Sequence, residues 1–169
     1  MQAGYLTTCA LFGSTDSRHE RLDVNELTLS VLQMVRGELV EHEITAEIDL
    51  ASNLPLVMGH KGQLREVFIN LVRNAIEAMS TVRDGQRMLQ VRAECHNHET
   101  IIISVQDSGP GIDPMVLDRL FDVFVTTKEK GMGLGLALCR MIIERHKGEL
   151  AVSPANPRGS VFRVALPAR

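Results

Sequence analysis

The segment that decides the fold spans residues 61–80 and reads KGQLREVFINLVRNAIEAMS. Its apolar side chains recur at intervals of three and four residues, which is typical of the buried face of an amphipathic helix. The apolar stripe consists of Leu64, Val67, Phe68, Leu71, Val72, Ala75, Ile76 and Met79. The pattern predicts a long helix with one face packed into a core.

The polar side of this predicted helix carries two asparagines. Asn70 and Asn74 are four residues apart and therefore lie on one face. Asn74 lies at the border of the apolar stripe, whereas Glu66, Asn70 and Glu77 occupy the polar flank. A carboxamide oxygen at such a border can bind Mg²⁺, a hard cation that prefers oxygen ligands. An ordinary helix surface would also explain the pair.

The flanking sequence predicts the remaining elements. Upstream we expect a helix over 24–39, capped by Asp23 or Asn25, then a half-buried strand over 44–50 and a loop that includes Gly59. Downstream we expect strands at 88–95 and 100–106, helical segments at 114–121 and 134–146, and a closing hairpin of 149–153 with 160–166. This order predicts an α+β fold: a two-layer α/β sandwich with helices on one face of a mostly antiparallel sheet.

Length and composition limit the possible functions. The chain has 169 residues, 44% hydrophobic and 23% charged, which suits one globular domain. Its net charge of −3 disfavours a general nucleic-acid binder. No apolar run approaches the ~18 residues of a membrane span, and no signal peptide is recognisable. We expect a cytoplasmic protein without membrane contact, with residues 1–22 as a flexible tail or linker remnant and 23–169 as the domain.

Two glycine clusters lie between residues 109 and 135. The first, Asp107-Ser108-Gly109-Pro110-Gly111, directly follows a predicted strand. A carboxylate held there, beside glycines that leave room for a flat ring, could accept a hydrogen bond from the exocyclic amine of adenine. Such a site would reject guanine, because the wrong base leaves a buried group unpaired. Alternatively, Asp107 merely caps a turn.

The second cluster, Gly131-Met132-Gly133-Leu134-Gly135-Leu136, opens a predicted helix. Backbone amides at a helix N-terminus favour anions. The preceding Thr126-Thr127-Lys128-Glu129-Lys130 adds hydroxyl and ammonium donors suited to a polyphosphate. The pattern matches neither a P-loop nor a dinucleotide-binding fingerprint. Two solvated surface loops are the alternative interpretation.

Together, these segments resemble the ATP-binding catalytic domain of sensor histidine kinases, most closely the nitrogen-regulation and oxygen-sensing branch. This domain belongs to the GHKL superfamily, which includes gyrase, the Hsp90 chaperone and MutL. The similarity covers roughly residues 25–167: an N box at 66–79, a G1 box at 107–112, an F box at 121–124 followed by 126–128, and a G2 box at 131–136. Gly159-Ser160-Val161-Phe162 resembles the last strand of the family. The resemblance implies the Bergerat ATP-binding fold, with a mixed sheet of about five strands.

The resemblance also implies roles at the matching positions. Asp107 should bind the adenine amine, Asn74 should hold Mg²⁺, and Asn70 should support the phosphates or the metal. Residues 113–133 would form a mobile lid over the nucleotide. The remaining expected ATP contacts are Gly109, Gly111, Ile112, Thr126, Thr127, Lys128, Gly131, Gly133, Leu134, Gly135, Leu136 and Ser160.

Two departures from the family pattern bear on the chemistry. Glu77 stands where many relatives carry Lys or Tyr, which puts a phosphate contact there in doubt. Asn70 stands where hydrolytic members carry a glutamate base, and a carboxamide cannot take a proton from water. The resemblance therefore implies phosphoryl transfer rather than autonomous hydrolysis.

The phosphoacceptor expected from the resemblance is a histidine on a separate dimerisation domain of the same full-length protein, with a response regulator downstream. His19-Glu20 resembles the start of that segment, but no helical hairpin fits between it and the next helix. We therefore expect no catalytic histidine in this fragment. A related serine kinase, a stand-alone ATPase and a non-catalytic nucleotide-sensing module are the alternatives.

Overall fold

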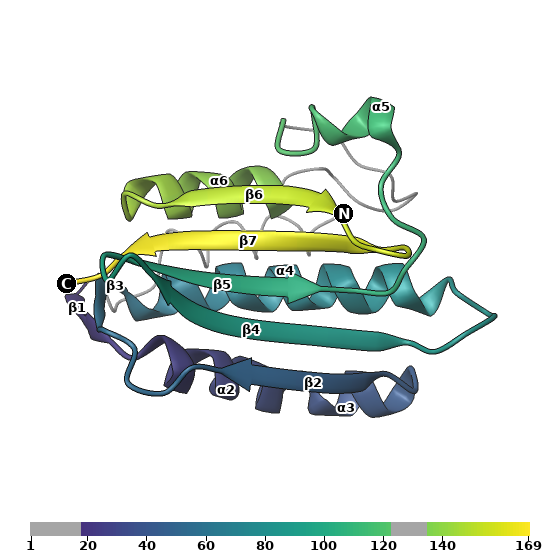
Figure 1. Cartoon of the computed structure of the whole chain (residues 1–169), viewed down its shortest axis with the longest axis horizontal. Coiled ribbons are helices and arrows are strands. Elements are labelled where there is room, and N and C mark those ends of the chain that lie inside the picture. The colour runs from purple at the N-terminus through teal and green to yellow at the C-terminus, as the bar shows by residue number, and fades with distance from the viewer. Residues whose placement is uncertain (1–17, 123–134) are drawn as a thin grey trace, which may run out of the picture.

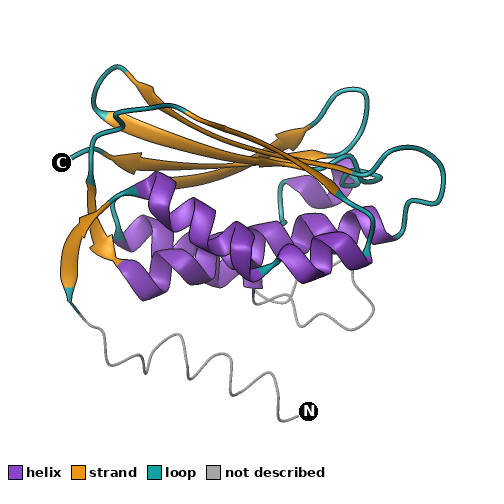
Figure 2. Ribbon diagram, turned by 90° about the horizontal axis from the view of Figure 1, so that it is seen from below, coloured by secondary structure: helices purple, strands orange, loops and turns teal. Residues whose placement is uncertain are grey.

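The computed structural model of the chain describes residues 18–122 and 135–169. A five-stranded sheet forms one layer, and helices cover one of its faces (Figures 1 and 2). In spatial order the strands are β2 (Thr45–Leu50), β4 (Met88–His96), β5 (Thr100–Gln106), β7 (Ser160–Pro167) and β6 (Glu149–Pro154). The helices are α2 (Val24–Met34), α3 (Arg36–Glu41), α4 (Lys61–Ser80), α5 (Pro114–Leu117) and α6 (Gly135–Arg145).

The sheet is mixed, as expected. β2 pairs with β4 in parallel, and the other three pairings are antiparallel. A separate two-stranded antiparallel sheet joins β1 (His19–Leu22) to β3 (Val57–His60). The predicted α+β sandwich is therefore confirmed.

The core lies between α4 and the sheet. All eight residues of the predicted apolar stripe are buried in α4, whose bounds coincide with the predicted segment. Burial alternates along β5, so that one of its faces meets the helices. Buried residues recur with a period of 3.6 residues along the helix and 2 residues along the strand, so each element turns one face to the core. Through this packing α4 also meets the loop that follows β5, where Gly109 lies against Ala78.

Some expectations from the sequence are wrong in detail. The helix expected over 24–39 divides at Val35 into α2 and α3, and the segment expected at 114–121 is helical only over α5. Gly59 lies in β3 rather than in a loop. The strand β2 is exposed along most of its length instead of half-buried, because it is an edge strand with a neighbour on one side only.

The segment before residue 23 also differs from the expected tail. Its last four residues form β1, in which His19 pairs with His60 and Leu22 with Val57. Four residues are too few for a recognisable period, and the partner strand lies more than thirty residues downstream. Pairing between distant segments leaves no local pattern.

Among the described residues, no helix combines the length and apolar character that crossing a membrane requires.

Candidate functional site

Asp107 lies immediately beyond β5 and is buried, with 4% of its surface exposed. Its N–H donates to the carbonyl oxygen of Ser160 at 3.0 Å. Its Oδ1 accepts the N–H of Gly109 at 2.8 Å. Asp107 therefore does cap a turn, as the alternative interpretation held, but burial distinguishes it from an ordinary turn aspartate, which is exposed.

The electrostatics of Asp107 reflect this burial. Loss of solvent raises the pKa of the carboxyl, and backbone hydrogen bonds from Gly109 and Ser160 oppose the shift. The backbone orients a carboxylate in this position, and any further hydrogen-bond donor would stabilise its buried negative charge. An exocyclic amine would be such a donor, and the hydrogen bond would be charge-assisted.

Glycines allow the loop after β5 to pack closely. A Cβ on Gly109 would lie 2.9 Å from Asp107 Oδ1 and 3.1 Å from the backbone carbon of Ala78 in α4. Gly159 has a φ of +104°, and a Cβ there would collide with the carbonyl oxygen of Asp107. A Cβ on Gly111 would lie 3.4 Å from the carbonyl oxygen of Gly159. The backbone on both sides of Asp107 is thus held in contact with β7 and α4.

The two asparagines of α4 lie between this loop and the start of α6. Asn70, Asn74 and Ala78 follow one another at intervals of four residues on one face of the helix. A Cβ on Gly135 would lie 3.1 Å from Asn70 Oδ1, while Gly109 packs on Ala78 two turns further along. Both asparagines are half-buried. The structure therefore brings the described parts of three of the four expected boxes, N, G1 and G2, together on either side of Asn74.

The oxygens at this position suit a magnesium ion bound mainly through phosphate. Asn70 and Asn74 offer neutral carboxamide oxygens, which are hard ligands. The described residues contain no cluster of three or more acidic, histidine or cysteine side chains arranged for a metal ion. Mg²⁺ often has few protein ligands and keeps waters and substrate phosphates. The donor set fits that arrangement.

Phe121 anchors the chain on the far side of the loop. Its ring meets Phe162 of β7 edge-to-face, with centroids 6.4 Å apart. The guanidinium of Arg140 in α6 lies 5.9 Å from the Phe121 ring centre. Asp113 caps α5 by accepting the N–H of Met115 at 2.9 Å. The segment between Asp107 and Phe121 is therefore attached to the fold at both ends.

Several expected site residues lie outside the described part of the chain. They are Thr126, Thr127, Lys128, Gly131, Gly133 and Leu134. Of the others, Ile112 and Leu136 are half-buried and pack against the core. Ser160 is 5% exposed and contacts Asp107 through its backbone. About half of the expected lid, residues 113–133, falls in the same undescribed segment.

Two residues of the site were missed by sequence reasoning. Gly159 was noted only as part of a strand, yet it makes room for the Asp107 carbonyl. Ser108 connects the loop to β4, because its Oγ accepts the N–H of Met88 at 2.9 Å and donates to the carbonyl of Gln86 at 3.0 Å. The glycine directly before β7 could have indicated the first residue, whereas nothing local in the sequence distinguishes Ser108.

Comparisons with known proteins identify the family. Residues 59–169 match the family described as histidine kinase-, DNA gyrase B-, and HSP90-like ATPase. The chain is 36% identical over 146 residues to the sensor protein TdiS of Thauera aromatica, covering 86% of this chain and 27% of TdiS. It is 38% identical over 125 residues to the sensory histidine kinase/phosphatase NtrB of Azospirillum brasilense, covering 68% of this chain and 31% of NtrB.

A solved structure shows the same likeness. The catalytic domain of histidine kinase ThkA superposes with a TM-score of 0.79 at 28% identity, covering 89% of this chain and 98% of that domain. The curated relatives are much longer than this chain, whereas the ThkA catalytic domain is of matching extent. The chain therefore belongs to the family of histidine kinase-, DNA gyrase B- and HSP90-like ATPases, and within it resembles the catalytic domains of sensor histidine kinases.

Proposed function

We propose that this domain binds Mg²⁺-ATP across the polar flank of α4 and presents the γ-phosphoryl group to a histidine. The observation that carries the proposal is the buried carboxylate of Asp107 beside a loop that packs on Ala78, with Asn70 against the start of α6. These two contacts are eight residues apart on α4, about 12 Å along the helix axis. A nucleotide is an elongated ligand, with its base at one end and its phosphates at the other.

Different residues would bind different parts of the nucleotide along that length. Asp107 would accept the adenine N6 amine, and Gly109 and Gly111 would leave room for the ring. Asn74, with Asn70 beside it, would hold the metal by carboxamide oxygens, and the amides at the start of α6 would face the phosphates. When bound, Mg²⁺ neutralises charge on the phosphate oxygens. The protein's contribution to phosphoryl transfer is chiefly positioning and electrostatics.

Transfer to a partner is favoured over hydrolysis by the chemistry of Asn70. A carboxamide has no basic site for a proton of attacking water, so it cannot act as the general base of an ATPase. The chain covers 27% and 20% of the lengths of TdiS and of sporulation kinase E from Bacillus subtilis. We therefore place the phosphoacceptor histidine on a dimerisation domain elsewhere in the full-length protein, and a response regulator downstream. Because the donor is ATP, the proposal places this domain in the cytoplasm.

Nucleotide binding is tested by titration calorimetry of ATP and GTP, with and without Mg²⁺. Losing a charge-assisted hydrogen bond should cost about 1.5–3 kcal/mol, or tenfold or more in affinity, in the Asp107→Asn variant. Asn74→Ala should weaken binding only when Mg²⁺ is present. Asp49→Asn makes the same chemical change on the exposed strand β2 and should bind ATP normally. Absence of ATP binding by folded protein, or equal affinity for GTP, would refute the site.

The phosphoryl acceptor is tested separately, by supplying the histidine-bearing dimerisation domain of the full-length protein with radiolabelled ATP. A phosphoryl group on histidine is lost in acid and kept in alkali, whereas phosphoserine shows the reverse. Labelling that survives acid would indicate a serine kinase instead. Phosphate release without any acceptor would indicate an ATPase, and tight ATP binding with no transfer would indicate a nucleotide-sensing module.

A further inference from the structure

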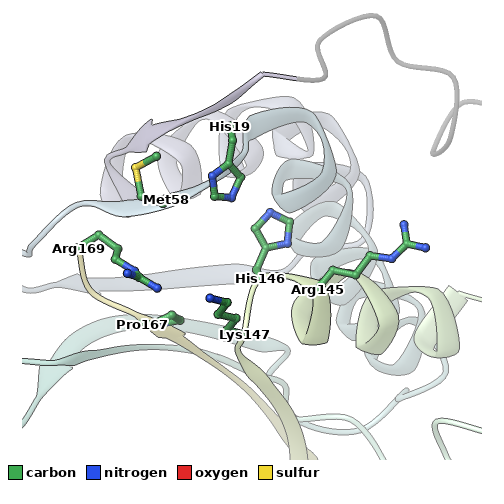
Figure 3. Close-up of a pocket in the computed structure, with 7 residues that line it drawn as sticks. All are labelled: His19, Met58, Arg145, His146, Lys147, Pro167 and Arg169. Carbon is green, nitrogen blue, oxygen red and sulfur yellow. The ribbon is translucent and has the colours of Figure 1, made fainter.

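A pocket lies at the other end of the sheet from Asp107. Its volume is about 340 Å³, and its lining residues are His19, Met58, Arg145, His146, Lys147, Pro167 and Arg169 (Figure 3). In the pairing of β5 with β7, Pro167 is opposite Thr100, at the start of β5, whereas Asp107 follows its end. Figure 1 likewise places β1, β3 and the C-terminus away from α5. The pocket shares no residue with the proposed nucleotide site.

The lining is positively charged. Three of its seven side chains are Arg or Lys, two are histidines, and none of these described lining residues is acidic. The side-chain ends of Lys147 and Arg169 point toward each other in the pocket, whereas Arg145 points away (Figure 3). In the described part of the chain the ion pairs lie elsewhere, and none involves Lys147 or Arg169.

Helix electrostatics explain only part of this charge. Cations at a helix C-terminus are favourable, which accounts for Arg145 and Lys147 at the end of α6. It does not account for Arg169, which follows β7 and reaches the same space from another part of the fold. Both side chains are exposed, so water screens much of their repulsion, and an anion held between them would remove the rest.

The backbone that carries both cations is fixed. Lys147 has a φ of +59°, and its N–H donates to the carbonyl of Glu144 at 2.9 Å. The next residue, Gly148, packs so closely on β7 that a Cβ would collide with the carbonyl oxygen of Ala165. The N–H of Arg169 donates to the carbonyl of Leu56 at 2.8 Å. The fold therefore fixes the backbone of both residues beside the same pocket.

The histidines contribute differently. His146 is 5% exposed; its Nδ1 lies 2.7 Å from the carbonyl of Ile142, and its Nε2 accepts the backbone N–H of His60 at 3.0 Å. Both ring nitrogens thus have backbone partners, and the ring lines one side of the pocket. His19, on β1, is exposed, and its ring centre lies 6.2 Å from that of His146. His19 is the imidazole that can donate to a ligand in the pocket.

We propose that this pocket binds a small divalent oxyanion of the phosphate class, held by Lys147, Arg169 and His19. The planar guanidinium of Arg169 can donate to two oxygens of one tetrahedral anion, and Lys147 adds a compact charge. The pocket is roughly ten times the ~30 Å³ that one water occupies, which leaves room for a phosphoryl group. Because His19 lies on β1 and the two cations on the α6–β6 turn and after β7, a bound anion connects the N-terminal strand to the rest of the domain.

The test is an NMR titration, in which sodium phosphate is added to isotope-labelled protein at pH 7 and constant ionic strength and the chemical shifts are recorded. We expect saturable shifts of the His19 imidazole and of the backbone amides of Lys147, Gly148 and Arg169. The double variant Lys147→Gln/Arg169→Gln should bind at least tenfold more weakly, with each single variant intermediate. Arg36→Gln, which removes the same charge from an exposed position in α3, should bind as the wild type does.

Glycerol phosphate in place of inorganic phosphate distinguishes the source of the anion. Binding of both points to a phosphoryl group on a larger molecule, and binding of phosphate alone points to the free ion. The proposal is overturned if the shifts grow linearly without saturation, if the double variant binds as tightly as the wild type, or if saturable shifts occur only around Gly109 and Gly135. The substituted side chains are exposed, so thermal unfolding should report folded variants throughout.

Discussion

Replacing Gly159 by alanine should damage both the stability of the domain and its nucleotide site. Gly159 has a φ of +104°, where a non-glycine residue costs of order 1–3 kcal/mol. Its new Cβ would also collide with the carbonyl oxygen of Asp107, which is backbone and cannot rotate away. Overpacking of this kind typically costs a further ~1–3 kcal/mol. We expect a loss of about 3 kcal/mol or more from a total of roughly 5–15 kcal/mol.

This loss is measured by thermal unfolding followed by circular dichroism. At this chain length, 1 kcal/mol shifts Tm by roughly 2–4 °C, so Gly159→Ala should unfold at least ~6 °C below the wild type. The same displacement moves Asp107, so the variant should also bind ATP about tenfold more weakly in calorimetry at a temperature where it is folded. Structure and binding are thus coupled through one backbone contact.

Gly37 provides the matched control. It lies in α3, and a Cβ there meets nothing within 4 Å. Gly37→Ala should leave ATP binding unchanged and stabilise the domain by up to about 1 kcal/mol, because alanine loses less backbone entropy than glycine in a helix. A Gly159→Ala variant with wild-type Tm and wild-type ATP affinity would refute the packing argument. An equal loss in Gly37→Ala would show that the effect is not specific to the Asp107 contact.

Two pH-dependent predictions follow from buried groups. Burial raises the pKa of Asp107, so the stability that this carboxyl contributes is present below its ordinary value of 3.8 and is lost as pH rises through the raised pKa. In urea unfolding, the free energy of unfolding of Asp107→Asn should therefore rise relative to that of the wild type between pH 4 and 7. A difference that stays constant over this range would contradict the prediction. Burial lowers the pKa of His146, with the charges of His60 and His19 acting in the same direction. Its stabilising contribution is present above its ordinary value of 6.5 and is lost as pH falls, because a proton on Nε2 breaks the bond from the His60 N–H. In His146→Gln the amide oxygen can accept that N–H at any pH, so the free energy of unfolding should fall less between pH 7 and 5 than it does in the wild type. If both proteins lose the same free energy over this range, His146 is not the cause of the loss.

Local patterns determined much of the fold. The α4 stripe predicted residues 61–80 without error, because a helix that buries one face must repeat its apolar residues at the helical period. The paired strands β4 and β5 were similarly visible from their composition and the polar turn between them. β1 and β3 were not visible, because each has four residues and is stabilised by pairing with a distant segment.

The candidate site likewise depends partly on local sequence and partly on contacts between distant segments. The sequence by itself determined which residue types were available: an aspartate at a strand end, glycines beside it, and two asparagines one turn apart on a helix. Only the tertiary structure decided that Gly109 and Gly135 contact α4 on either side of Asn74, and that Gly159 receives the Asp107 carbonyl. The convergence of Lys147 and Arg169 was likewise decided there. Such contacts join segments that are far apart in the chain, and their distances depend on how the layers pack, which no local period encodes.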